Sequence, residues 1–228
     1  MSEATARGGT RTLCLVGCGS AFDTIAGEPD AYAGHGPWLL RPAESVARLA
    51  ATRHHLLEGL DPATTQLFVA VDSNALNYAR LELYGAARLA GFRMVSLVHA
   101  RAWVAPGATL ADNVWIGPGA SVSPGCVLAG DVLVNPAARL DTGASVGMHG
   151  WIGPGASIGS GASVGPHSVI GAGVFLRGGL KVGRHCVLDR AGAWQRDLPD
   201  GSLVEPEFDA PARIVGPGYS FQKIQQRS

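Results

Sequence analysis

The chain has 228 residues, and its 18 lysines and arginines are balanced by 18 aspartates and glutamates. A net charge of zero gives no long-range attraction to a polyanion, so we expect no nucleic-acid partner. No apolar run approaches the roughly 20 residues that cross a bilayer, and the first residues lack the apolar stretch of a signal peptide. We therefore expect a cytoplasmic protein with no membrane insertion.

The N-terminal part alternates strand and helix signals. A strand at Thr12–Val16 is followed by the glycine-rich turn Gly17–Ser20, and a second strand is expected at Gln66–Val71. Helical spacing covers residues 42–58, and a second helix is expected from the N-cap candidates at 72–74 to Ala90, before Gly91. A third strand at 92–97 completes a small parallel α/β domain, which we place at residues 1–97.

An aliphatic residue then recurs at every sixth position from Val98 to Leu188, without one insertion. Pro-Gly pairs fall between these positions and supply the φ angles of sharp turns. Three hexads make one coil of 18 residues, and successive coils stack in parallel about 4.8 Å apart. The fold class is therefore mainly β with a small α/β domain: a parallel β-helix at 98–204 and a C-terminal tail at 205–228.

Trp103, Trp115 and Trp151 each precede a hexad aliphatic and should point out of the prism. Because outward tryptophans usually lie on a covered face, they favour contacts between the subunits of a homotrimer.

The hexad repeat resembles the left-handed β-helix of the hexapeptide-repeat acyltransferases, and 192–204 with Pro211-Ala-Arg-Ile-Val215 is similar to that family's ending. The segment Val71–Arg80, followed by Tyr84, 91–99 and Arg101, resembles the PglD/NeuD-type sugar O/N-acetyltransferases, whose N-terminal domain is Rossmann-like and holds a nucleotide-linked sugar. The resemblance implies substrate-binding roles for Gly17, Gly19, Asn74 and Asn77. It also implies acetyl-CoA as co-substrate.

The family's catalytic base is a histidine two residues after a hexad aliphatic, and no histidine occupies that column here. Two alignments place Met148 or Ser160 at its position. His149, His167 and His185 instead form a column of their own, spaced by 18 residues, so they should stack on one edge of the prism.

Asp131 lies one coil below His149, where it could fix the imidazole tautomer. We therefore take His149, with Asp131 and His167, as candidate catalytic residues, without a metal. Solvent-exposed corner residues and a zinc-binding ladder are the alternatives that the pattern leaves open.

Cations gather late in the repeat, and the resemblance implies that they meet the phosphates of CoA: Lys181, Arg184, Arg190 and Arg213. The expected function is transfer of an acetyl or similar acyl group from acyl-CoA to a sugar or sugar nucleotide. One alternative is a catalytically degenerate β-helix that binds or scaffolds. Another is a trimeric, histidine-ligated metalloprotein of the carbonic anhydrase type.

Overall fold

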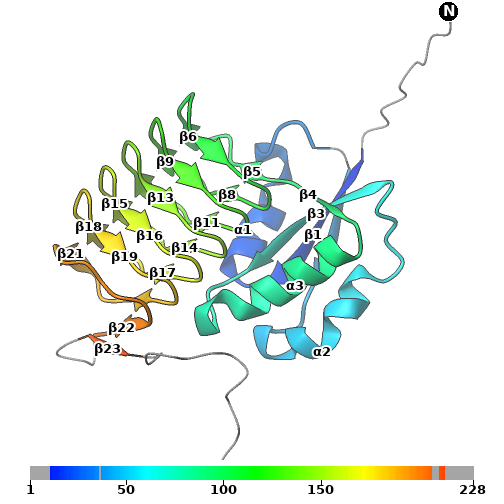
Figure 1. Ribbon diagram of the computed structural model, residues 1–228. Coiled ribbons are helices and arrows are strands. Elements are labelled where there is room, and N and C mark those ends of the chain that lie inside the picture. The colour runs from blue at the N-terminus through cyan, green and yellow to red at the C-terminus, as the bar shows by residue number, and fades with distance from the viewer. Residues whose placement is uncertain (1–10, 36, 207–210, 214–228) are drawn as a thin grey trace, which may run out of the picture.

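The computed structural model describes residues 11–35, 37–206 and 211–213. Two parts lie side by side: an α/β part and a stack of β coils, with helix α3 (Tyr78–Leu89) beside the coils (Figure 1). No helix in the described part of the chain has the length and hydropathy of a membrane span.

The α/β part is built on a parallel sheet with the order β2-β1-β3-β4. Its strands are β1 (Thr12–Cys18), β2 (Trp38–Pro42), β3 (Thr65–Val71) and β4 (Arg93–Met94). Helices α2 (Val46–Leu57) and α3 pack on one face, whereas α1 (Ser20–Gly27) packs on the other. The expected parallel alternation of strands and helices is therefore present, and its description as Rossmann-like stays a prediction.

Several local elements differ from those expected. Helix α1 and strand β2 are not among the elements expected from the sequence, and the third expected strand is divided between β4 and the first strand of the coils, β5 (Leu97–Val98). Helix α3 begins at Tyr78, not after 72–74, because the short 3-10 helix Ala75–Asn77 intervenes and Asn77 is left-handed at φ 64°. A second 3-10 helix spans Pro29–Ala31.

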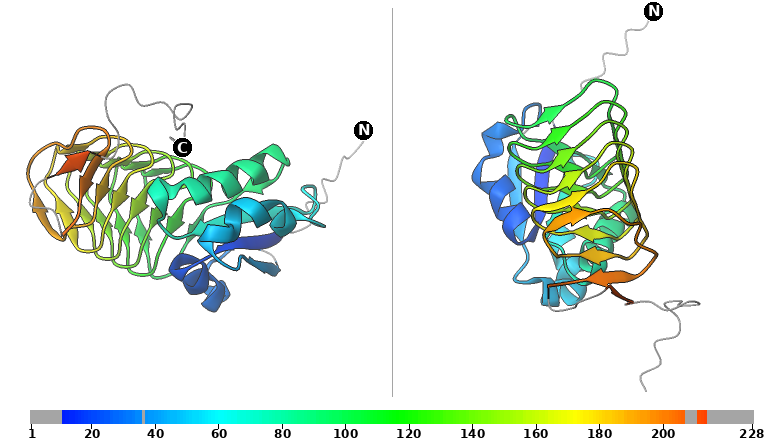
Figure 2. Two further views of the ribbon diagram at one scale, coloured as in Figure 1. Left: turned by 90° about the horizontal axis from the view of Figure 1, so that it is seen from below. Right: turned by 90° about the vertical axis from the view of Figure 1, so that its left-hand side faces the viewer.

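The coils confirm the parallel β-helix. Strands 18 residues apart pair in parallel, so Val146 lies beside Val164 and Val164 beside Val182. These valines are 2–3% exposed inside the prism, where the hexad column should lie. Three sheets form its sides (Figure 2), and we call them sheets B, C and D.

Sheet B contains β5, β8 (Trp115–Ile116), β11 (Leu133–Val134), β14 (Trp151–Ile152), β17 (Val169–Ile170), β20 (Val187–Leu188), β22 (Ser202–Val204) and β23 (Ala212–Arg213). Sheet C contains β6 (Trp103–Val104), β9 (Ser121–Val122), β12 (Arg139–Leu140), β15 (Ser157–Ile158), β18 (Val174–Leu176) and β21 (Gly192–Trp194). Sheet D contains β7 (Thr109–Leu110), β10 (Val127–Leu128), β13 (Ser145–Val146), β16 (Ser163–Val164) and β19 (Lys181–Val182).

The repeat loosens at both ends. Val98, the first residue of the aliphatic column, is 37% exposed because no coil precedes it. At the other end Leu188 pairs with Val204, which is 16 residues away and not 18, and β23 then adds an antiparallel strand to β22.

The outward face of sheet B is covered by the chain's own α/β part. Trp115 is fully buried and Trp151 is 7% exposed, and both belong to the apolar cluster that contains Phe22 and Phe68. Trp103, on sheet C, is 54% exposed. All three tryptophans point away from the prism, as expected, but the expectation that another subunit covers them was wrong for Trp115 and Trp151.

Candidate functional site

One corner of the prism, between sheets D and B, carries a column of polar residues. Asn113, Asp131, His149, His167 and His185 occupy the same turn position in successive coils, with left-handed φ of 53–61°. The ring centroids of His149 and His167 are 4.6 Å apart, and those of His167 and His185 are 5.1 Å apart. The stacking predicted from the 18-residue spacing is confirmed.

Asp131 is fully buried and is the centre of a hydrogen-bond network. Its Oδ2 lies 2.8 Å from Nδ1 of His149, and its Oδ1 accepts a bond of 2.6 Å from Nδ2 of Asn113. The Asn113 amide also bonds both backbone groups of Val69 in β3. Because an ionised carboxylate only accepts hydrogen bonds, Nδ1 of His149 is the donor in this contact.

Arg80 enters this corner from α3 and is also fully buried. Its Nε donates to Oδ2 of Asp131 at 3.0 Å, and Nη2 donates to the carbonyl oxygens of Asp131, His149 and Gly150. Nη1 donates to the carbonyl of Val71. A buried ion pair persists only when its remaining hydrogen-bonding groups are satisfied, and here they are.

Two further residues on the same face of α3 contact an earlier turn of this corner. Tyr84 donates to Oδ1 of Asp112 at 3.1 Å and touches the His149 ring edge-on. Arg88 bonds Tyr84 and pairs with Asp112. This role of Arg80, Tyr84 and Arg88 was not predicted from the sequence, although their spacing of four places them on one helical stripe.

The histidines differ in their access to solvent. His149 is 4% exposed under α3. His167 is half-buried and lies on the wall of a groove of about 750 Å³, formed between α3 and the late coils and lined by Tyr78, Leu81, Glu82, Pro166, His167, Arg184 and His185. His167 is therefore the candidate base that a ligand in the groove reaches directly.

The imidazole of His167 is neutral at pH 7. Burial, the neighbouring His149 and, to a smaller extent, His185 and Arg80 lower its pKa to about 4. Its Nδ1 lies 3.3 Å from the carbonyl oxygen of Leu76, which favours a proton on Nδ1 and a lone pair on Nε2. Burial also lowers the pKa of His185.

The glycine-rich turn has a structural explanation of its own. A side chain at Gly17 would collide with the carbonyl oxygen of Ala70, and one at Gly19 would lie 2.5 Å from Cγ of Asp72. The Asp72 carboxylate accepts bonds from the N–H groups of Ser20 and Ala21, the first turn of α1. A carboxylate of the chain thus occupies the place where a helix N-terminus binds a phosphate.

The two candidate asparagines have different surroundings. Asn74 is exposed, whereas Asn77 is 1% exposed and its Nδ2 donates to the carbonyl of His149 at 2.7 Å. Asn77 therefore belongs to the contact between α3 and the histidine corner. Roles for Gly17, Gly19, Asn74 and Asn77 in substrate binding stay predictions.

A further histidine, His99, is engaged at both ring nitrogens. Nδ1 accepts from the N–H of Arg101 at 3.0 Å, and Nε2 lies 3.1 Å from a carboxylate oxygen of Glu28. This pairing leaves no ring nitrogen to serve as a base.

The two alternatives for the family's usual base position lie on different corners. Met148 precedes His149 in the histidine corner and is 44% exposed, whereas Ser160 lies in the turn between sheets C and D. Neither side chain is a base of useful strength at neutral pH.

The late cations belong to the last coils but are spread around the prism. Lys181 is on sheet D, Arg184 in the histidine corner, Arg190 in the turn after β20, and Arg213 in β23. Arg184 pairs with Asp200 at 2.9 Å. Their role toward CoA stays a prediction.

No group of three histidine, cysteine, aspartate or glutamate side chains in the described ranges is arranged to hold a metal ion. The rings of His167 and His185 are stacked, and the ring of His149 is tilted by 31° from that of His167. The carbonic anhydrase alternative, whose histidine ligands would come from different subunits, stays a prediction.

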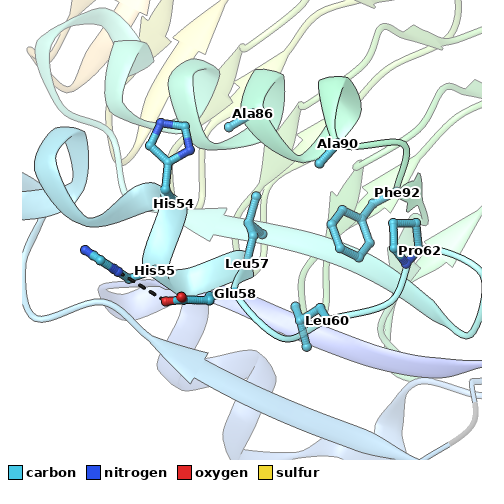
Figure 3. Close-up of a pocket in the computed structure, with 9 residues that line it drawn as sticks. All are labelled: His54, His55, Leu57, Glu58, Leu60, Pro62, Ala86, Ala90 and Phe92. Atoms are coloured by element: carbon cyan, nitrogen blue, oxygen red, sulfur yellow. Dashed lines mark hydrogen bonds and ion pairs between the residues drawn. The ribbon is translucent and has the colours of Figure 1, made fainter.

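A second pocket, of about 520 Å³, lies in the α/β part between α2 and the end of α3 (Figure 3). Apolar side chains form most of its wall, and the polar ones are His54, His55 and Glu58, of which the last two pair with each other at 3.3 Å. The His55–Glu58 pair is exposed to solvent, unlike the buried His149–Asp131 pair.

The sequence matches no protein-family model and no curated protein. Its fold is similar to solved structures. The acetyltransferase domain of PglB from Neisseria gonorrhoeae, in complex with acetyl coenzyme A, is 25% identical with a TM-score of 0.74, over 90% of this chain and 100% of that chain.

Perosamine N-acetyltransferase from Caulobacter crescentus, as a single-site mutant in complex with CoA and GDP-perosamine, is 23% identical with a TM-score of 0.69, over 84% of this chain and 92% of that chain. The likeness to both proteins spans the α/β part and the coils together. The chain resembles the hexapeptide-repeat sugar acetyltransferases. The resemblance expected from the sequence is thereby confirmed, and at 23% identity the second likeness is one of fold.

Proposed function

We propose that the protein transfers an acetyl or similar small acyl group from acyl-CoA to a sugar or a nucleotide-linked sugar. The observation that carries the proposal is the similarity, over 90% of the chain, to an acetyltransferase domain with acetyl coenzyme A bound. The groove beside His167 supports it, because the groove places a neutral imidazole where a ligand can reach it.

In the proposed reaction, a hydroxyl or amino group of the acceptor attacks the thioester carbon while its proton passes to Nε2 of His167. The carbon–sulfur bond then breaks, and the thiolate of CoA leaves and takes up the proton. His149 and Asp131 lie directly behind His167 and form a base–orienter pair. Lys181, Arg184, Arg190 and Arg213 are the candidates for contacts with the CoA phosphates.

Release of free thiol from acetyl-CoA, measured with a panel of sugars and sugar nucleotides, tests the function. We expect His167→Asn to reduce turnover by about a hundredfold or more, the usual contribution of a general base, and His149→Asn to reduce it as well. Asparagine accepts the left-handed backbone of both sites. His54→Asn, exposed on α2, is the matched control. Full activity in both corner variants would eliminate the assignment.

A second candidate, a binding protein descended from such an enzyme, is favoured by one observation. The column that carries the family's base contains no histidine, and His149 is 4% exposed. Binding of CoA by calorimetry, with no thiol release from acetyl-CoA in the presence of any acceptor, would support this candidate over the enzyme.

We also propose that the protein is a homotrimer. Trp103 (54% exposed) and Phe175 (39%) lie on sheet C, and Val127 (50%) lies on sheet D, so two sides of the prism carry apolar groups that the described residues leave uncovered. Sedimentation equilibrium should give three times the mass of 23.5 kDa. Phe175→Lys should reduce the measured mass, and a monomeric wild-type protein would refute the proposal.

A further inference from the structure

The corner under α3 contains one buried anion and two groups able to balance it. The side chains of Arg80 and Asp131 are both 0% exposed, and that of His149 is 5% exposed. Both partners approach the same atom, since Oδ2 of Asp131 lies 3.0 Å from Nε of Arg80 and 2.8 Å from Nδ1 of His149.

The charge balance of this corner decides whether the imidazole of His149 is neutral or protonated. The guanidinium of Arg80 is always protonated, so the Arg80–Asp131 pair is already neutral. A proton on His149 would leave one uncompensated positive charge in a buried site, which is costly. His167, whose ring is 4.6 Å from that of His149, offers no negative charge to offset it.

We infer that Arg80 is a positioning residue that holds His149 in its neutral form, with Nδ1 protonated and Nε2 carrying the lone pair. The catalytic meaning of this inference rests on the proposed function, but the charge state does not. The other groups beside His149 are Tyr84 on α3, His167 in the next coil, and Asn77, whose uncharged amide donates to the backbone carbonyl of His149.

The inference makes a prediction that a purely structural role of Arg80 does not make. In Arg80→Met, Asp131 loses its permanent counter-ion, and His149 is the group placed to replace it. We expect His149 to take up a proton and to become an imidazolium at pH 7, paired with the Asp131 carboxylate.

Nitrogen-15 NMR of the histidine side chains measures this state directly, because a protonated and an unprotonated ring nitrogen resonate in different ranges. In wild-type protein at pH 7, His149 should show one protonated and one unprotonated ring nitrogen. In Arg80→Met, both ring nitrogens of His149 should be protonated. A neutral His149 in both proteins, or an imidazolium already present in the wild type, overturns the inference.

Three further variants make the measurement interpretable. Arg80→Lys keeps the positive charge and should leave His149 neutral. The double variant Arg80→Met/Asp131→Asn removes both charges, so it should also leave His149 neutral, and it tests the inference if Arg80→Met alone does not fold. An imidazolium in that double variant would contradict the charge-balance argument. Arg88→Met, on the exposed part of the same helical stripe, should leave the His149 signals unchanged.

The NMR measurement does not depend on enzyme activity. The proposed function and the inference about Arg80 can therefore be refuted separately. A protein without acyltransferase activity whose His149 responds as described would refute the proposed function alone. An active enzyme whose His149 ignores the loss of Arg80 would refute the inference alone.

Discussion

At the scale of single residues, the histidine corner depends on an unusual backbone. Its five residues all have left-handed φ, which asparagine and aspartate tolerate better than most residues and which histidine also adopts. The 18-residue spacing was enough to predict that Asp131 lies beside His149, since the β-helix brings residues one coil apart into contact. Arg80 could not be found in this way, because its place depends on how α3 packs against the coils.

The lowered pKa of His167 predicts how stability depends on pH. Its pKa is about 4 in the folded protein against a usual value of 6.5, so the unfolded chain binds this proton at higher pH than the folded one. The contribution of His167 to the free energy of unfolding is therefore complete above pH 6.5 and is lost as the pH falls to about 4.

Urea unfolding at a series of pH values measures this dependence. Between pH 6.5 and 4, the free energy of unfolding of His167→Asn should fall by less than that of the wild type. The free energy of unfolding of His54→Asn should follow the wild-type curve. Parallel curves for wild type and His167→Asn would show that burial does not perturb this imidazole.

At the scale of elements, sheet B owes its stability to what covers its outer side. Trp115 is fully buried there and its Nε1 donates to the hydroxyl of Tyr32 at 3.1 Å, whereas Trp103 occupies the equivalent outward position on sheet C and is 54% exposed. Trp115→Ala should lower the free energy of unfolding by about 3–5 kcal/mol, the usual cost of deleting a buried aromatic side chain.

Trp103→Ala is the matched control for that substitution. In an isolated protomer it should change the free energy of unfolding by no more than about 0.5 kcal/mol, as expected for an exposed position. Equal losses in the two variants, measured by denaturant unfolding in the Phe175→Lys background that should disrupt the proposed trimer, would contradict the burial of Trp115.

The elements that sequence reasoning missed are those that packing decides. The coils were predictable because each hexad repeats the same local pattern, from the aliphatic at its strand to the glycine at its turn. By contrast, α1 has only eight residues, and β2 ends in Pro42 at the edge of the sheet, so neither has a strong local signal. For the outward tryptophans, the hexad pattern predicts their direction but not the identity of the covering surface.

At the scale of the whole molecule, two unlike contacts join the α/β part and the coils, in addition to the smaller pairing of His99 with Glu28. One is the apolar cluster that unites Phe22 and Phe68 with Trp115 and Trp151, and the other is the buried polar corner around Arg80. Exposing the apolar face and leaving Asp131 without its counter-ion would both be unfavourable, so neither part can separate from the other at low cost.

We therefore expect the two parts to unfold together. Thermal unfolding followed by far-ultraviolet circular dichroism, which reports on α2 and α3, should coincide with unfolding followed by the fluorescence of the tryptophans, including those on sheet B. In Arg80→Met the polar contact is broken while the apolar one remains, so both signals should be lost at a lower temperature than in the wild type. Two separate transitions in the wild-type protein would show instead that the apolar cluster and the Arg80 corner are too weak to couple the parts.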